Sequence, residues 1–135
     1  MRDLLLYLHI LAGLAIIMLP FIIISLKNKS SLLKPLSFLT AAISWLILIP
    51  AGKFYTTFYP ATKTLIKAGS LPWAHSIIME TKEHWGLLLP IIGTVAAGLV
   101  FNNKLKDSKR WWILLSILSV ILAIMGRIVT IGGTK

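Results

Sequence analysis

Four long apolar segments, separated by stretches that hold most of the charges, dominate the pattern of hydrophobic and polar positions along the chain. They cover residues 4–26, 36–52, 84–102 and 111–131. A helix needs about 20 apolar residues to cross the hydrocarbon of a bilayer, and each segment is close to that length. The pattern therefore predicts an all-α integral membrane protein, with one domain over residues 1–135 built as a bundle of four transmembrane helices.

The composition agrees with this fold class and excludes several kinds of chemistry. Hydrophobic residues make up 57% of the chain and charged residues 13%, which is more apolar surface than one small soluble core could bury. The chain has no cysteine, so disulfides, thiolate metal sites and iron–sulfur clusters are excluded. The net charge of +10 does not indicate nucleic-acid binding, because the cations cluster at the ends of apolar segments, where lipid headgroups lie.

The distribution of cations predicts an orientation in the cell membrane. Two short loops, residues 27–34 and 102–110, fall on the same side of the bundle and hold many lysines against a single acid, Asp107. Cytoplasmic loops usually carry such an excess of Lys and Arg. We therefore expect these loops in the cytoplasm, and both termini and the long connection over residues 53–83 outside.

The long connection is too rich in apolar and aromatic residues for a disordered linker. Its tyrosine and tryptophan side chains are of the kind that gathers at membrane interfaces, so we expect much of it to lie on the membrane surface. No proline or glycine occurs from Trp73 until Gly86. This part therefore predicts a helix that runs directly into the third span.

One polar residue of each span falls at a common height above the short loops. His9, Lys53, His84 and Arg127 lie about 17 to 20 residues from the loop charges, which is roughly 25 to 30 Å at the rise of an α-helix. His9 precedes Lys53 by nearly the same interval as His84 precedes Arg127. Such a repeat predicts two hairpins related by a pseudo-twofold axis, with the two histidines facing each other near the outer boundary.

A b-type haem would suit this layer. Two imidazoles on facing helices can bind the iron axially, and two cations can neutralise the propionates. We therefore expect His9 and His84 to ligate a haem iron, and Lys53 and Arg127 to hold its propionates. Plainer interpretations stay open, since a boundary histidine often only bonds a carbonyl or a headgroup and a cation at a helix end often only extends to the interface.

The segment WAHSIIMETKEHWG, residues 73–86, contains further candidates. Glu80, Glu83 and His84 share one helical face at spacings of three and four residues, and such a set can hold a divalent metal. Glu83 could equally pair with Lys82, Lys53 or Arg127, or accept a proton beside a haem or a quinone. His75 lies roughly 13 Å further out than His84, where it could bind a second haem, a metal or a partner.

Two motifs carry a resemblance to a known group of proteins. The opening LLYLHILAGLAII, and KEHWGLLLP at the start of the third span, resemble the small four-helix membrane proteins related to the CopD domain and to HemJ-type protoporphyrinogen oxidases. In the HemJ type, a histidine of the first span and a basic ligand at the start of the third are associated with haem b. The resemblance implies these roles for His9 and His84, whereas the aromatic connection departs from both patterns, so neither porphyrinogen oxidation nor copper transport is carried over.

The sequence favours a b-type cytochrome that transfers electrons between a quinone, or a partner subunit, and an external acceptor. A non-enzymatic accessory subunit of a larger membrane complex is the first alternative. A metal transporter that uses Glu80, Glu83 and His84 is the second, although the near absence of acids from the spans argues against a proton path across the whole bilayer. The expected partners are the lipid bilayer and other membrane or redox subunits, and no nucleic acid.

Overall fold

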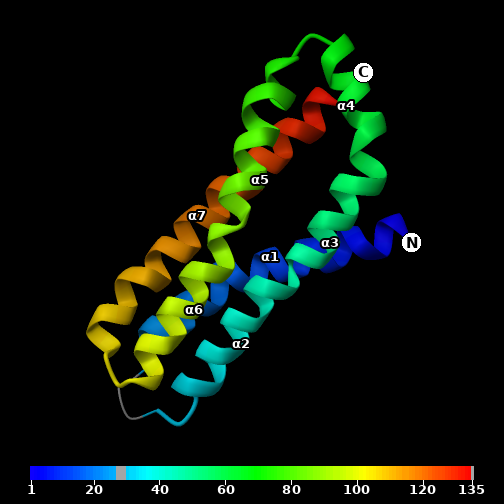
Figure 1. Cartoon of the computed structure of the whole chain (residues 1–135). Helices are drawn as coiled ribbons and strands as arrows, with labels where there is room; N and C mark the ends of the chain where they lie inside the picture. Colours follow the sequence, from blue (N-terminus) through cyan, green and yellow to red (C-terminus); the bar gives the residue numbers. More distant parts are fainter. Residues whose placement is uncertain (27–29, 135) are drawn as a thin grey trace.

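The computed structural model describes residues 1–26 and 30–134, and these residues form helices with no strand among them (Figure 1). Four helical segments are long and apolar enough to cross a membrane: Arg2–Ser25, Leu33–Ala68, Ala74–Phe101 and Leu105–Gly132. The predicted fold class, an all-α membrane bundle, is therefore confirmed. In chain order the helices are α1 (Arg2–Ser25), α2 (Leu33–Leu46), α3 (Leu48–Lys53), η1 (Phe54–Phe58), α4 (Tyr59–Ala68), η2 (Ala74–Met79), α5 (Glu80–Gly86), α6 (Leu88–Phe101) and α7 (Leu105–Gly132).

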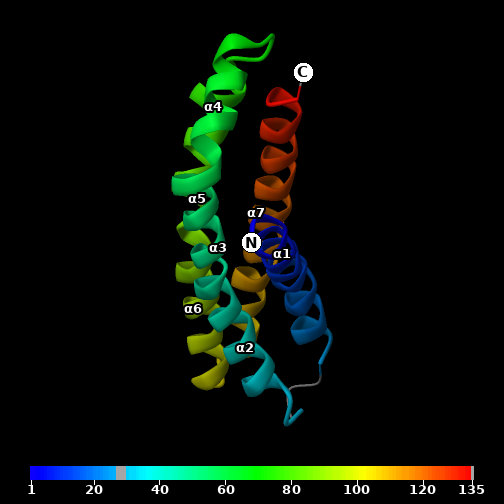
Figure 2. The same ribbon diagram turned by 90° about the vertical axis from the view of Figure 1, so that its right-hand side faces the viewer.

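The four segments form a ring in which helices adjacent in the sequence are antiparallel (Figures 1 and 2). α1 packs against α2 and α7, and α6 packs against the same two helices. α1 and α6 are therefore diagonal to each other, as are α2 and α7. This is the arrangement expected of two helical hairpins placed around one central axis.

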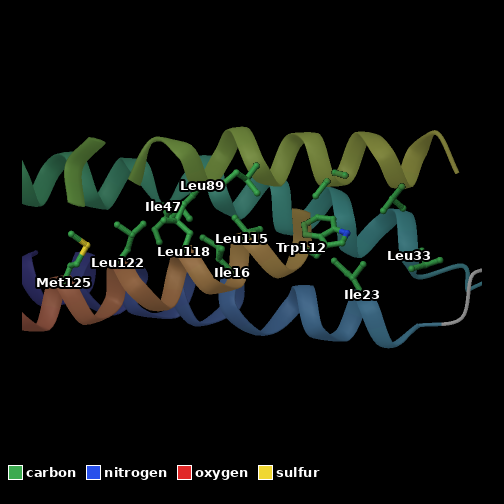
Figure 3. Packing of buried hydrophobic residues seen from close by; sticks show 14 residues of the cluster. Ile16, Ile23, Leu33, Ile47, Leu89, Trp112, Leu115, Leu118, Leu122 and Met125 are labelled. Carbon is green, nitrogen blue, oxygen red and sulfur yellow. The ribbon is translucent and has the colours of Figure 1, made fainter. Parts of the chain in front are cut away.

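A main hydrophobic core fills the four-helix part of the molecule (Figure 3). Each helix turns a narrow stripe inward at spacings of three and four residues, as Ile16, Pro20 and Ile23 do in α1. Large apolar side chains on the outer faces, such as Phe21 and Ile117, are exposed, as expected where lipid surrounds the bundle. The buried residues of the main core are Ile16, Ile23, Leu33, Ile47, Leu89, Ile92, Ala96, Ala97, Val100, Trp112, Leu115, Leu118, Leu122 and Met125.

Small residues allow α2 and α6 to approach closely. A Cβ atom added at Gly93 would lie 3.0 Å from Ser44 Oγ and 3.4 Å from the Cα atom of Ala41. The buried hydroxyls of Thr40 and Ser44 each donate a hydrogen bond of 2.8 Å to the carbonyl four residues earlier, so they need no partner across the contact. Contacts between small residues are a common way for helices to associate in lipid.

Two prolines interrupt the long segments without ending them. Proline lacks the N–H group that would bind the carbonyl four residues before it. Pro50 therefore leaves the carbonyl of Leu46 free, and Pro90 leaves that of Gly86 free, at the residues where α2 and α5 end. A helix resumes within two residues in both cases, so the chain keeps its course through the bundle.

The long connection differs from its prediction. Instead of a separate segment along the membrane surface, residues 54–68 continue the second helix through η1 and α4, and only residues 69–73 form the turn. The helix predicted from Trp73 onward is confirmed, since η2 and α5 lead directly into α6. A helix of 36 residues, such as Leu33–Ala68, is about 54 Å long. The hairpin that Leu33–Ala68 forms with Ala74–Phe101 therefore extends well beyond the hydrocarbon layer of a bilayer, which is roughly 30 Å thick.

A second hydrophobic core explains why the hairpin stands upright. Tyr59, Ile66, Ala74 and Val129 are buried together, on α4, η2 and the last turns of α7. α7 continues past the level at which α1 begins (Figure 1), so it presents an apolar face on which both arms of the hairpin can pack. Burying that face is favourable, whereas a connection lying on the membrane would leave it uncovered.

The tight contact between α2 and α6 yields a first prediction. Gly93→Leu should lower the free energy of unfolding by about 1–3 kcal/mol, because the added side chain must push Ser44 and the α2 backbone away. Thermal unfolding of the purified protein in detergent, followed by circular dichroism, measures the change. Gly98→Leu is the matched control, because it lies on the same helix and a Cβ there meets nothing within 4 Å; equal melting temperatures for the two variants would contradict this packing.

Candidate functional site

A group of polar side chains lies between the two hydrophobic cores. On α7, Met125 belongs to the main core and Val129 to the second one, so Gly126 marks the level between them. Ile78 packs against both cores. At this level lie His9, Lys82 and Glu83, with Phe54 and Gly126 beside them, and we call these five residues the polar layer. The sequence predicts a layer at about this height, but most of its predicted members are different.

His9 is the one predicted member that faces inward. It lies on the stripe of α1 that continues to Ile16 and Ile23, and it is half-buried. Its ring meets the ring of Phe54 edge-on, with 6.3 Å between the centroids. Its Nδ1 atom is buried and has no hydrogen-bond partner among the described residues, which leaves an imidazole nitrogen available inside the bundle.

His84 lies on the outer face of α5. It is exposed, and its Nδ1–H group donates a hydrogen bond of 2.7 Å to the backbone carbonyl of Glu80. Two residues along an α-helix correspond to a rotation of about 200°, so His84 points away from the interior that Lys82 faces. His84 and His9 therefore do not face each other across the bundle.

The two cations predicted to hold propionates also face outward. Lys53 and Arg127 are both exposed. Arg127 follows Gly126 on α7, while Met125 and Val129 provide the buried stripe of that helix. The height predicted for both cations agrees with the polar layer, but their direction around the helix does not.

Lys82 is the cation that does enter the layer. Its Cε atom would lie 3.3 Å from a Cβ added at Gly126. The aliphatic part of the Lys82 side chain therefore packs against α7 at Gly126, where the helix has no side chain of its own. Its positive charge acts on the imidazole of His9. The ion pairs recorded for the described residues, Arg2–Asp3 and His75–Glu80, do not include it.

Glu83 supplies the carboxylate of the layer. Its Oε1 atom is buried and has no hydrogen-bond partner within the described part of the chain. Its negative charge acts on Lys82 and on the phenols of Tyr55 and Tyr59. The layer thus combines an ammonium group, a carboxylate and an imidazole, of which the last two each leave a buried atom unpaired.

His75 is buried instead of lying at the surface. Only 4% of it is exposed, and its Nδ1 atom is 2.9 Å from the hydroxyl of Tyr59. Its Nε2 atom is 3.6 Å from Oε1 of Glu80. The Glu80 carboxylate favours the proton on Nε2, so Nδ1 accepts the hydrogen bond that Tyr59 donates. Both ring nitrogens are therefore engaged, which leaves neither free for a haem or a metal.

The acidic segment does not assemble a metal site. Glu80 is directed to His75, and His84 turns outward. Within residues 1–26 and 30–134, no three histidine, aspartate or glutamate side chains converge so that they could hold a metal ion.

Sequence reasoning missed Lys82 and Phe54, although a signal for Lys82 exists. The inward stripe of α6 runs through Leu89, Gly93 and Ala96, and continuing its spacing of three and four residues backward reaches Gly86 and Lys82. Extending the stripe would have selected Lys82 over His84. For Phe54 no such signal exists, because the π-helical turn at η1 changes the direction of the residues that follow Lys53.

No protein-family model, curated protein or solved structure matches this chain.

The contact between Tyr59 and His75 yields a second prediction. Tyr59→Phe should destabilise the hairpin by about 1–3 kcal/mol, because it leaves Nδ1 of a buried histidine without a donor. Hydrogen exchange of residues 59–79, read by mass spectrometry, should become faster in this variant than in the unaltered protein. Tyr55→Phe is the matched control, since Tyr55 stacks on Tyr59 and its hydroxyl has no recorded hydrogen bond in the described chain; equal protection in both variants would count against the buried pair.

Proposed function

We propose that this integral membrane protein binds a quinone, whose headgroup enters the polar layer while its tail remains in the lipid. The observation that carries the proposal is the unpaired state of His9 Nδ1 and Glu83 Oε1, which lie in the layer with Lys82. Buried polar atoms are nearly always hydrogen-bonded in native proteins. Two unpaired atoms in one layer therefore favour a ligand that supplies the missing partners.

The chemistry of the layer suits a quinone and its quinol. The ammonium of Lys82 can only donate, so it matches a carbonyl oxygen of the oxidised ring. The carboxylate of Glu83 accepts, so it matches a hydroxyl of the reduced ring, and His9 can do either. Phe54 offers an aromatic edge beside His9. One set of side chains can thus hold both redox states, and Glu83 or His9 can take the proton that a quinol hydroxyl releases.

The position of the layer suits a ligand that arrives from the bilayer. His9 lies near the start of α1, and beyond that level only α4, η2 with α5, and α7 surround the interior (Figures 1 and 2). A headgroup at this height would be close to one boundary of the hydrocarbon. The excess of cations in the short loops favours a cytoplasmic position for those loops, and in that orientation the layer would lie near the outer face of the membrane.

Electron transfer requires a redox centre on a second protein. In this proposal the chain is the quinone-binding subunit of a larger membrane complex, and its partner exchanges electrons with the bound ring. The chain itself positions the headgroup and moves protons at Glu83 and His9. The accessory-subunit alternative differs in one respect, since it expects stable partners but no bound quinone.

Binding of a short-tailed ubiquinone analogue tests the proposal. Lys82→Met should weaken binding about tenfold or more, because it removes a charge-assisted hydrogen bond, and Glu83→Gln should weaken binding of the quinol more than that of the quinone. Quenching of tryptophan fluorescence in detergent measures both affinities. Lys53→Met is the matched control, since this lysine lies at a similar height but is exposed; equal affinities for Lys82→Met and Lys53→Met would refute the site.

A b-type haem is the second candidate, and one observation favours it: the unpaired, inward-facing Nδ1 of His9. The other predicted groups do not fit in this conformation, because His84, Lys53 and Arg127 are exposed. His84 does leave its Nε2 unbound while Nδ1–H holds a backbone carbonyl, as metal-ligating histidines often do. Ligation of one iron by both histidines would require α5 to turn by about half a rotation.

The absorbance spectrum of protein purified from haem-replete cells separates the two candidates. The quinone proposal predicts no low-spin haem band, because only one of the two histidines reaches the interior. A band that shifts on reduction, and that disappears in both His9→Ala and His84→Ala but persists in His75→Ala, would instead establish the haem. Preparing the same variants in the absence of haem would control for loss of folding.

A further inference from the structure

A second, independent site lies at the opposite end of the bundle, which we call the loop end, where α1 ends and α2 and α7 begin. Trp112 of α7 is fully buried, yet its indole Nε1–H has no hydrogen-bond partner among the described residues. Figure 3 shows this nitrogen directed toward the part of the bundle where Ile23 and Leu33 lie. An indole N–H can only donate, so the structure leaves a buried donor that points toward the loop end.

A small pocket adjoins this donor. Its apolar walls come from the end of α1 and the starts of α2 and α7, including Ile23, Leu33 and Leu105, and Trp112, Ser108 and Lys109 complete it. Its volume is about 10 Å³, roughly the space that one oxygen atom the size of a water molecule needs. Ser108 already donates its hydroxyl proton to the carbonyl of Leu105, at 2.8 Å. The buried donor left at the pocket is therefore the Trp112 N–H, and the exposed Lys109 lies at its edge.

The charge around the pocket selects an anion. Lys104, Lys106, Lys109 and Arg110 lie within about two helical turns, with Asp107 as the single acid among them. The ion pairs recorded in the described part of the chain include none of these residues. Among the described residues no acidic side chain lines the pocket, so an oxygen that enters it meets the Trp112 N–H in a positive field.

We propose that this pocket binds a phosphate oxygen of an anionic phospholipid. The mouth lies where the apolar faces of the helices give way to lysines, which is the depth of lipid headgroups. Trp112 and Lys109 each donate to an oxygen of the phosphate. Because the pocket has room for about one oxygen atom, the glycerol end of the lipid stays outside it, against the apolar ends of the helices, a contact that free phosphate or water cannot make. The site would hold one lipid between the first and second hairpins.

Lipid retention by the full-length protein tests this assignment. The purified protein is loaded from vesicles of phosphatidylglycerol, washed in detergent and weighed by native mass spectrometry. Trp112→Phe keeps an aromatic ring but removes the donor, and Lys109→Gln removes the charge. Each should reduce the fraction of protein with one bound lipid about tenfold, since a hydrogen bond to a charged group is lost. Lys106→Gln, on the same helix but outside the pocket, should retain lipid like the unaltered protein.

Three results would overturn the proposal. Equal retention in Lys109→Gln and Lys106→Gln would mean that only general surface charge attracts the lipid. Retention of neutral phosphatidylcholine to the same extent would show that the pocket does not select anions. Displacement of the bound lipid by an equal concentration of inorganic phosphate would show that phosphate alone is recognised. If Trp112→Phe fails to fold, Lys109→Gln carries the test, because Lys109 is exposed and its side chain is not needed for the core.

Discussion

The burial of one long face of α7 holds both parts of this protein together. α7 contributes to the main core through residues such as Trp112 and Leu122, and to the second core through Val129. It packs against α1 and α6 in the bundle, and against α4, η2 and α5 beyond it. Because α1 begins below the end of α7 (Figure 1), the upper part of this face is covered only if the hairpin between α2 and α6 folds back upon it. The upright hairpin follows from that requirement.

The same geometry produces the polar layer. Between the two cores α7 has Gly126, which leaves room for the stem of Lys82, and α1 contributes His9 from its inward stripe. Neither group could be placed in an apolar core without a large desolvation cost. An unpaired buried polar atom typically costs about 1–3 kcal/mol, and the layer contains two of them, on His9 and Glu83. A quinol headgroup could donate to Glu83 Oε1 and also pair with His9 Nδ1, and for this reason we propose a binding role for the layer.

Much of the architecture follows from the sequence, and the reason is physical. The length and polarity of each span are local properties, so the four helices, their approximate limits and the height of the polar level can all be counted along the chain. The direction of a side chain around its helix requires in addition the register of the inward stripe, since a step of two residues changes the direction by about 200°. His84 has the predicted height but faces outward. Lys82 lies at a similar height and faces inward. The upright hairpin was equally inaccessible, because it depends on Val129 and Ala74, which are distant in the sequence and meet only in the fold.

Cross-linking of paired cysteines measures whether Lys82 points into the bundle, and it needs no background substitutions because the chain has no cysteine of its own. One protein carries Lys82→Cys with Gly126→Cys, and the other carries His84→Cys with Gly126→Cys. After treatment with a short thiol-specific cross-linker in native membranes, proteolysis between α5 and α7 shows whether the two fragments stay joined. We expect efficient cross-linking for the pair at 82 and 126 and little for the pair at 84 and 126. The reverse result would place His84 inside the bundle and Lys82 outside it, and would exclude the polar layer described above.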